Sequence, residues 1–282
     1  MSRFLDLNLL LSVLRLCVWL VLLSVIFVPL ERLFAHQRQK IFRKAILTDL
    51  AYYFLSGLIP GLLLGAPLAL VAWLVHHAIP AGFTSAVTAL PTWLQIVAAV
   101  VVAEIGFYWG HRWSHEIPFL WRFHAIHHSA EQLDFLVNSR VHPVDMVFTR
   151  LCGLIPLYVL GLATILGQSA SLVPVVVLLL GTVWGFFIHA NVRWRFGPLE
   201  WLIATPAFHH WHHTNDGPGG YVNNNFAPLL PWVDRLFGTL YLPKDKRPAH
   251  YGINEPLPTR FLGQLVWPFH ISVEETHAKH EA

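Results

Sequence analysis

Histidine is the residue whose spacing in this chain points most directly to chemistry. Eleven of the eighteen histidines fall between residues 111 and 213, most of them in three short clusters. The clusters read His111-Arg-Trp-Ser-His115, His124-Ala-Ile-His127-His128 and His209-His210-Trp-His212-His213. Imidazole nitrogen is a common ligand of zinc, copper, iron and nickel. The clusters therefore predict a metal site.

The spacing within each cluster also suggests how many metal ions are held. Residues three and four apart share a face of an α-helix, so each cluster is expected to present its histidines on one face. A tetrahedral zinc takes only four ligands, and three converging faces supply eight imidazoles, enough for two metal ions. Isolated histidines such as His36 and His250 are more typical of hydrogen bonding to backbone. His142 and His189 are candidates for a ninth and a tenth ligand. The predicted ligands are therefore His111, His115, His124, His127, His128, His142, His189, His209, His212 and His213.

The composition of the chain is that of a membrane protein. Charged residues make up 12% of the chain, against about 25% in soluble domains, and hydrophobic residues make up 55%. The net charge of +3 is small, and in a membrane protein Lys and Arg are better interpreted as markers of topology than as a nucleic-acid surface. We expect no nucleic-acid partner.

Apolar stretches of the length of a membrane crossing recur along the chain. A helix needs about 20 apolar residues to cross a bilayer. The first stretch contains Arg15 and lacks a small-residue cleavage pattern, so it is predicted to be a membrane helix rather than a signal peptide. The expected fold is an all-α integral-membrane bundle of about four to five transmembrane helices, capped by a cytoplasmic histidine-rich helical domain. The stretches are 9–30, 51–76, 93–110, 147–166 and 170–189.

The distribution of Lys and Arg predicts the orientation. Segment 31–49 holds five of them, whereas 77–92 holds no charged residue, which puts 31–49 in the cytoplasm. Alternation then places 111–146 and everything after 189 on the same side, so the three clusters share the cytoplasmic face of a bacterial inner membrane or an endoplasmic reticulum. We expect the chain to divide into N-terminal transmembrane helices with a basic cytoplasmic loop (1–92), a histidine-rich domain that is the candidate for catalysis (93–245) and a C-terminal tail (246–282).

Two carboxylates next to the first cluster are candidates for catalysis or for orienting ligands. Glu104 lies seven residues before His111, on the same helical face and two turns deeper, where an unpaired carboxylate is costly. The alternative is that Glu104 pairs with Arg15. Glu116 directly follows His115 and either orients an imidazole or is solvated.

Three further polar residues lie close in sequence to a histidine or a basic residue. Asp145, three residues after a histidine, either orients an imidazole or is solvated. Asn191, two residues after His189, is a candidate for holding a metal-bound water. Asp234 stands beside Arg235 and is interpreted as a structural ion pair.

The run from His111 to Ser129 resembles the signature of the fatty acid hydroxylase/sterol desaturase superfamily. The later segments Ser-Arg-Val-His142-Pro, Phe-Ile-His189-Ala-Asn191-Val and Thr-Pro-Ala-Phe-His209-His-Trp-His212-His213 match it too. The likeness covers roughly residues 95–245 and is greatest for the branch that contains alkylglycerol monooxygenase and bacterial sterol desaturase family proteins. His210 stands where relatives often carry Arg, so it is not expected to be a ligand.

The resemblance implies a membrane-bound non-haem di-iron oxygenase. Two iron ions would be the cofactor and dioxygen the co-substrate. The products would be a hydroxylated or desaturated lipid: a sterol or hopanoid, a fatty acyl chain, a carotenoid or an ether lipid. The same histidines would also suit a zinc-dependent membrane hydrolase or a metal transporter. Against the transporter, the histidines cluster at helix ends rather than along a path through the membrane.

Such an oxygenase needs electrons from elsewhere. The sequence contains no G-x-G-x-x-G nucleotide fingerprint and only two cysteines, too few for an iron–sulfur cluster. We therefore expect an external electron donor: cytochrome b5, a ferredoxin with its reductase, or a pterin. The basic residues of 31–49, with Lys244, Lys246 and Arg247, either bind an acidic redox partner or only fix the topology.

Overall fold

The computed structural model describes residues 2–163, 173–217 and 223–270. Within these ranges the regular structure is helical, and the β-type pairing consists of two isolated bridges, Ala35 with Val192 and Thr214 with Tyr251. The all-α prediction is confirmed.

Among the described residues, three segments are long and apolar enough to cross a membrane: Leu7–Leu33, Ile46–Ala78 and Thr92–Glu116. The first lies in α1 (Ser2–Leu33) and the third is α5 (Thr92–Glu116). The second consists of α2 (Ile46–Leu58) and α3 (Pro60–Ala78). Pro60 occupies the start of α3, where a missing N–H costs no helical hydrogen bond.

The fourth and fifth predicted crossings correspond to α7 (Pro143–Val159) and α8 (Val173–His189). α7 has 17 residues, fewer than the roughly 20 that a crossing needs, and 17 residues of α8 are described. The turn predicted at 167–169 lies outside the described residues. α7 packs closely on α5, since a Cβ atom at Gly110 would come within 2.8 Å of the Cys152 side chain.

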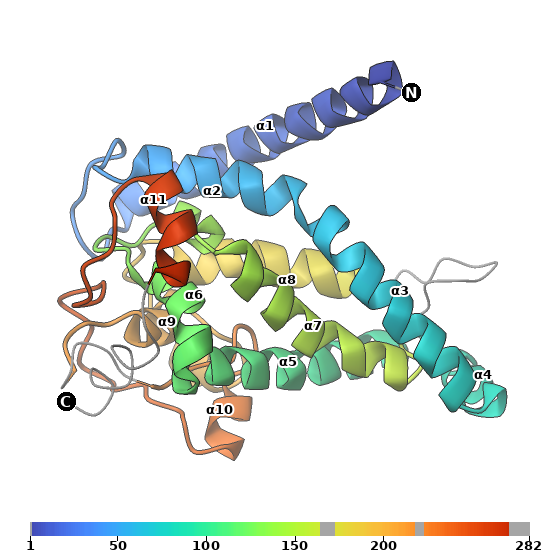
Figure 1. Ribbon diagram of the computed structural model, residues 1–282. Helices are drawn as coiled ribbons and strands as arrows, with labels where there is room; N and C mark the ends of the chain where they lie inside the picture. The colour runs from blue at the N-terminus through green and yellow to red at the C-terminus, as the bar shows by residue number, and fades with distance from the viewer. Residues whose placement is uncertain (1, 164–172, 218–222, 271–282) are drawn as a thin grey trace.

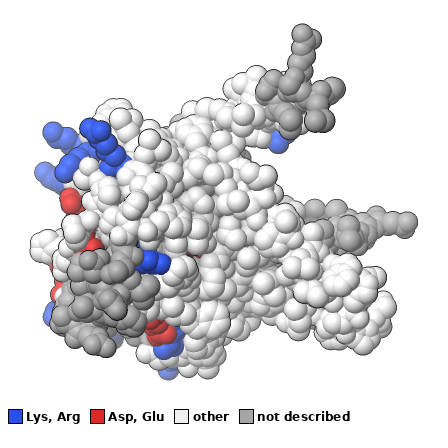
Figure 2. All heavy atoms as spheres, viewed as in Figure 1, with Lys and Arg blue, Asp and Glu red and all other residues white. Residues whose placement is uncertain are grey.

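The helices place the three histidine clusters at one end of the bundle (Figure 1). The loop between α1 and α2, the last turns of α5, and α6 (Pro118–His128) lie there. So do α9 (Pro206–His212), α10 (Trp232–Leu236) and α11 (Phe261–Val266). The short helix α4 (Ala81–Thr88) lies at the opposite end. Most of the charged side chains on the visible face gather at the histidine end (Figure 2). That the histidine end faces the cytoplasm stays a prediction.

Candidate metal centre

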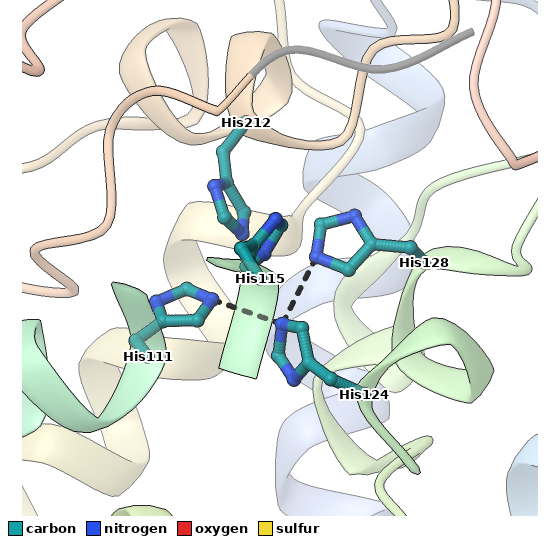
Figure 3. A group of neighbouring side chains, drawn as sticks. All are labelled: His111, His115, His124, His128 and His212. Atoms are coloured by element: carbon teal, nitrogen blue, oxygen red, sulfur yellow. Dashed lines mark hydrogen bonds between the residues drawn. The ribbon is translucent and has the colours of Figure 1, made fainter. Parts of the chain in front are cut away.

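Nine of the ten predicted ligands come together in two adjoining groups. Within each group, one ligand nitrogen of every member lies within 4.8 Å of the others. The five-histidine cluster is shown in Figure 3, where the rings turn toward a common centre. It consists of His111, His115, His124, His128 and His212, and the four-histidine cluster of His127, His189, His209 and His213.

The local sequence explains how four helices deliver these side chains. α5 continues past the expected end of its apolar stretch to Glu116, which puts His111 and His115 one turn apart. Pro118 begins α6 after the bend at Ile117. Thr205 caps α9, where its side chain accepts a hydrogen bond from the Phe208 N–H at 3.4 Å.

The second and third runs of histidines in the sequence are each divided between the five-histidine and the four-histidine cluster. His124 and His128 join the five-histidine cluster, whereas His127 joins the other. A helical turn has 3.6 residues, so the residues three and four positions after a given residue lie on opposite sides of the line that runs through it along the helix. The prediction of one shared face per cluster was therefore too coarse.

In the five-histidine cluster, the Nδ1 atoms of His111 and His124 meet oxygen acceptors. His111 Nδ1 donates to the Phe226 carbonyl at 2.7 Å. His124 Nδ1 lies 2.9 Å from the Asp145 carboxylate, which also accepts from the Ser114 hydroxyl at 3.2 Å. Asp145 therefore orients an imidazole, one of the two roles considered for it. A carbonyl can only accept, so His111 carries its proton on Nδ1 and presents Nε2 as a lone pair.

The four-histidine cluster repeats this arrangement. His127 Nδ1 donates to the Arg140 carbonyl at 3.1 Å, and His189 Nδ1 donates to the Gly185 carbonyl at 2.7 Å. Both rings therefore also present Nε2 as a lone pair.

The resulting lone pairs face one another at close range. The Nε2 atoms of His127 and His189 are 3.2 Å apart, and those of His111 and His124 are 3.1 Å apart. Two lone pairs at this distance repel unless a cation lies between them. His212 adds a buried Nε2 with no protein hydrogen-bond partner, while its Nδ1 donates to the Asn224 carbonyl at 2.8 Å. The donor set therefore fits two imidazole-bound metal ions.

Burial keeps the imidazoles in the form that binds metal. Burial, together with the neighbouring His213 and His212 rings, holds the pKa of His128 well below its usual 6.5. Burial and the His111 and His115 rings do the same to the pKa of His212. Both rings are therefore neutral at pH 7 and need not lose a proton before they bind a metal.

The structure does not bring His142 or Glu116 to either cluster. His142 caps α7: its Nδ1 accepts from the Val144 N–H at 3.1 Å, and its Nε2 donates to the Leu265 carbonyl at 3.1 Å. Both of its nitrogens are thus used. Glu116 instead forms an exposed ion pair with Arg112 at 2.7 Å.

The side chains of Glu104 and Asn191 also form hydrogen bonds with backbone groups rather than with the histidine clusters. Glu104 is buried and does not pair with Arg15; its Oε1 accepts from the N–H groups of Leu229 and Leu230 at 2.7 and 2.6 Å. Asn191 exchanges two hydrogen bonds with the backbone of Gln37, at 2.7 and 3.0 Å. Each side chain ties a loop to the helix or turn that carries ligands.

Two further expectations concern Asp234 and His210. Asp234 does not pair with Arg235; it accepts from the N–H groups of Phe226 and Ala227 at 2.8 and 2.9 Å. His210 lies outside both clusters, as predicted, and its Nε2 donates to the Ala190 carbonyl at 3.1 Å.

Asn225 is a positioning residue that the sequence did not reveal. It is fully buried and adopts a left-handed conformation with φ 59°. Its amide nitrogen donates to the carbonyls of Phe208 and Tyr241 at 2.9 and 2.7 Å, and its oxygen accepts from the Tyr241 N–H. The residues on either side supply the carbonyls that orient His212 and His111. Asn tolerates positive φ better than most residues, and this was the only signal in the run Asn223-Asn-Asn225.

We expect Asn225→Ala to weaken metal binding by about 10- to 100-fold, the usual cost of losing a partner that orients a ligand. Alanine loses three hydrogen bonds and is strained at positive φ. Asn225→Gly relieves only the strain, so it should raise the melting temperature above that of the alanine variant while metal release stays fast. Chelator-driven metal release measures the effect. Asn224→Ala, which keeps its carbonyl, is the control; equal release from Asn225→Ala and wild type would contradict the assignment.

Comparison with known proteins finds a family and relatives that are named for the modification of lipids. The family model described as fatty acid hydroxylase matches residues 96–239, about half of the chain. An ornithine lipid hydroxylase of Rhizobium tropici is 38% identical over 183 residues, covering 64% of this chain and 51% of the relative. Human alkylglycerol monooxygenase is 31% identical over 169 residues, covering 60% and 34%. The chain thus spans about half or less of the length of these curated relatives. No solved structure matches.

Proposed function

The chain belongs to the fatty acid hydroxylase family, and on that premise we propose that it is a membrane-bound non-haem di-iron oxygenase. It hydroxylates or desaturates a C–H bond of a lipid, with dioxygen as co-substrate. The observation that carries the proposal is the pair of histidine clusters with lone pairs facing one another. Bound iron would supply the redox chemistry for dioxygen activation, which zinc lacks.

The chain's own residues do the remaining work. Imidazole Nε2 atoms would hold the metals, while backbone carbonyls and Asp145 fix the rings through Nδ1. Trp121 and Phe226, both buried, lie against His115 with ring centroids 5.2 and 5.1 Å away. Such apolar walls exclude water and so protect an oxidising centre from side reactions.

The substrate class follows from the surroundings and the relatives. The centre lies at the ends of α5 and α8, both apolar helices, where a lipid can approach from the bilayer. The relatives are named for ornithine lipids and alkylglycerols, which are lipids with a polar head. We propose a lipid of this amphipathic kind; fatty acyl chains, sterols or hopanoids and carotenoids are alternatives.

Electrons come from an external donor at the cytoplasmic face: cytochrome b5, a ferredoxin with its reductase, or a pterin. The predicted basic patch is smaller than the sequence suggested. Arg43 is buried in ion pairs with Asp49 and Asp134. Arg247 turns inward and donates to the Val192 carbonyl at 3.2 Å.

The test combines metal analysis with lipid analysis. Protein purified anaerobically from iron-replete cells is expected to carry about two irons per chain, because the two clusters offer five and four imidazoles. Lipid extracts from cells with the protein should contain a species heavier by one oxygen or lighter by two hydrogens than extracts from cells without it. Persistent zinc with no such mass change would instead indicate a hydrolase or a transporter.

A further inference from the structure

A shallow depression of about 600 Å³, wide open to solvent and called the cavity below, lies on the loop that joins the first two membrane helices. α1 ends at Leu33 and α2 begins at Ile46. Because both helices can cross the membrane, the loop 34–45 lies at the membrane–water boundary. Basic side chains crowd this corner of the molecule (Figure 2). The cavity is lined by Arg38, Gln39, Lys40, Phe42, Arg43, Lys44 and Gln132.

One wall of the cavity is fixed by buried charges. The Arg43 guanidinium donates to Asp134 at 2.6 Å and lies 2.5 Å from Asp49. Asp49 in turn pairs with Arg140, whose carbonyl orients His127 of the four-histidine cluster. Two neutralising carboxylates leave Arg43 little charge for a ligand, so its part in the cavity is structural.

Three other cations at the cavity are free. Arg38, Lys40 and Lys44 are exposed, and no carboxylate of the described residues lies within 4.0 Å of their charged groups. The backbone that carries them is held in place. Gln39 donates to the Leu133 carbonyl at 2.8 Å, and Gln37 is tied to Asn191. A preformed cavity with unpartnered cations complements an anion such as a phosphate.

Exposed apolar side chains lie near these cations. Phe42 is 84% exposed and Leu47, in the first turn of α2, is 76% exposed. The Thr48 hydroxyl donates to the Thr259 carbonyl at 3.1 Å, which joins this turn to the segment leading into α11, where Leu262 is 72% exposed. Cations beside exposed apolar groups suit the headgroup layer of a bilayer, where phosphates meet the cations and the apolar groups enter the boundary of the acyl chains.

We propose that this cavity binds the phosphate-bearing headgroup of an anionic phospholipid of the surrounding bilayer. Arg38, Lys40 and Lys44 contact the phosphate, and Phe42 and Leu47 lie against the glycerol and acyl chains. The site holds the metal-bearing end of the bundle at a fixed depth in the membrane. It involves no member of either histidine cluster and does not depend on the proposed oxygenase activity.

The experiment compares two double variants of the full chain in a neutral detergent. Lys40→Gln/Lys44→Gln removes two cavity cations, and Lys244→Gln/Lys246→Gln removes two exposed cations elsewhere at the same end. Native mass spectrometry with added phosphatidylglycerol gives the apparent affinity. We expect about a thirtyfold loss for the first pair, from about 1 kcal/mol per basic residue near an anionic surface, and less than a twofold change for the control pair.

Ligand controls separate the lipid from its phosphate and from a protein partner. Thermal stability should rise with phosphatidylglycerol and stay unchanged with the same concentration of inorganic phosphate or phosphatidylcholine. Equal losses in both double variants, or an equal response to inorganic phosphate, would overturn the proposal. So would a cavity variant that keeps its lipid affinity but slows reduction by an acidic redox protein, because the occupant would then be that protein.

Discussion

Replacing His209 with alanine is expected to lower the bound iron from about two ions to about one per chain and to abolish product formation. His209 Nε2 lies 3.0 Å from His189 Nε2 and 3.1 Å from His213 Nε2, at the centre of the four-histidine cluster. Its loss leaves three imidazoles and a gap at one metal. The loss of activity should exceed the roughly 10- to 100-fold that removal of an orienting partner costs.

The five-histidine cluster should respond differently. His128→Ala or His212→Ala leaves four imidazoles there, the same number that the other cluster offers in the wild type. We expect activity to be lost with a smaller loss of iron. Iron is counted by plasma emission spectroscopy on detergent-purified protein, and product by mass spectrometry.

Two histidines outside the clusters serve as controls. His250, whose side chain is 79% exposed beside Asp216, should tolerate alanine without loss of iron. His210→Gln should keep the iron too but melt earlier, because His210 also accepts a hydrogen bond from the buried Tyr251 hydroxyl at 2.9 Å. Two irons and full activity in His209→Ala would refute the ligand assignment.

Spacing alone predicted eight of the nine clustered histidines, because the geometry of a helix is local; His189 stands by itself in the sequence and was added as a single candidate. His111 and His115 needed only a helix that continues to Glu116. Spacing did not predict the division of His124, His127 and His128 between the two histidine clusters, which depends on where α5, α8 and α9 approach α6. That approach is a property of tertiary packing, which sequence periodicity does not encode.

The polar residues near the clusters were harder to interpret. Glu104, Asn191 and His142 are close in sequence to ligands, yet each satisfies backbone groups that are distant in sequence. Buried N–H and C=O groups need partners wherever loops pack inside a protein. Which side chain supplies the partner depends on loop placement. Asn225 was missed for the same reason. Its role depends on the neighbouring carbonyls of Asn224 and Phe226, which accept hydrogen bonds from His212 and His111 only in the folded chain.

The contacts of Trp121 indicate where the proposed electron donor would approach the five-histidine cluster. Trp121 packs on His115 and His128, with ring centroids 5.2 and 5.6 Å away, and its indole N–H donates to Glu255 at 3.1 Å. Glu255 is partly exposed at the histidine end. The five-histidine cluster therefore lies close beneath the surface that the proposed donor would meet.

Without an added donor, the iron-loaded protein is expected to make at most about one product per chain. Hydroxylation consumes the C–H bond, dioxygen, two electrons and two protons, and yields an alcohol and water. Two ferrous ions hold only the electrons for a single event, and the sequence shows no nucleotide fingerprint or iron–sulfur cysteines to supply more. Prereduced protein in lipid nanodiscs, given oxygen and NADPH alone, should stop after that event. Addition of a ferredoxin with its reductase, of cytochrome b5 with its reductase, or of a reduced pterin should raise the yield to many products per chain with one of the three. Many products per chain from NADPH alone would show that this chain takes electrons directly, and the proposal of an external donor would be wrong.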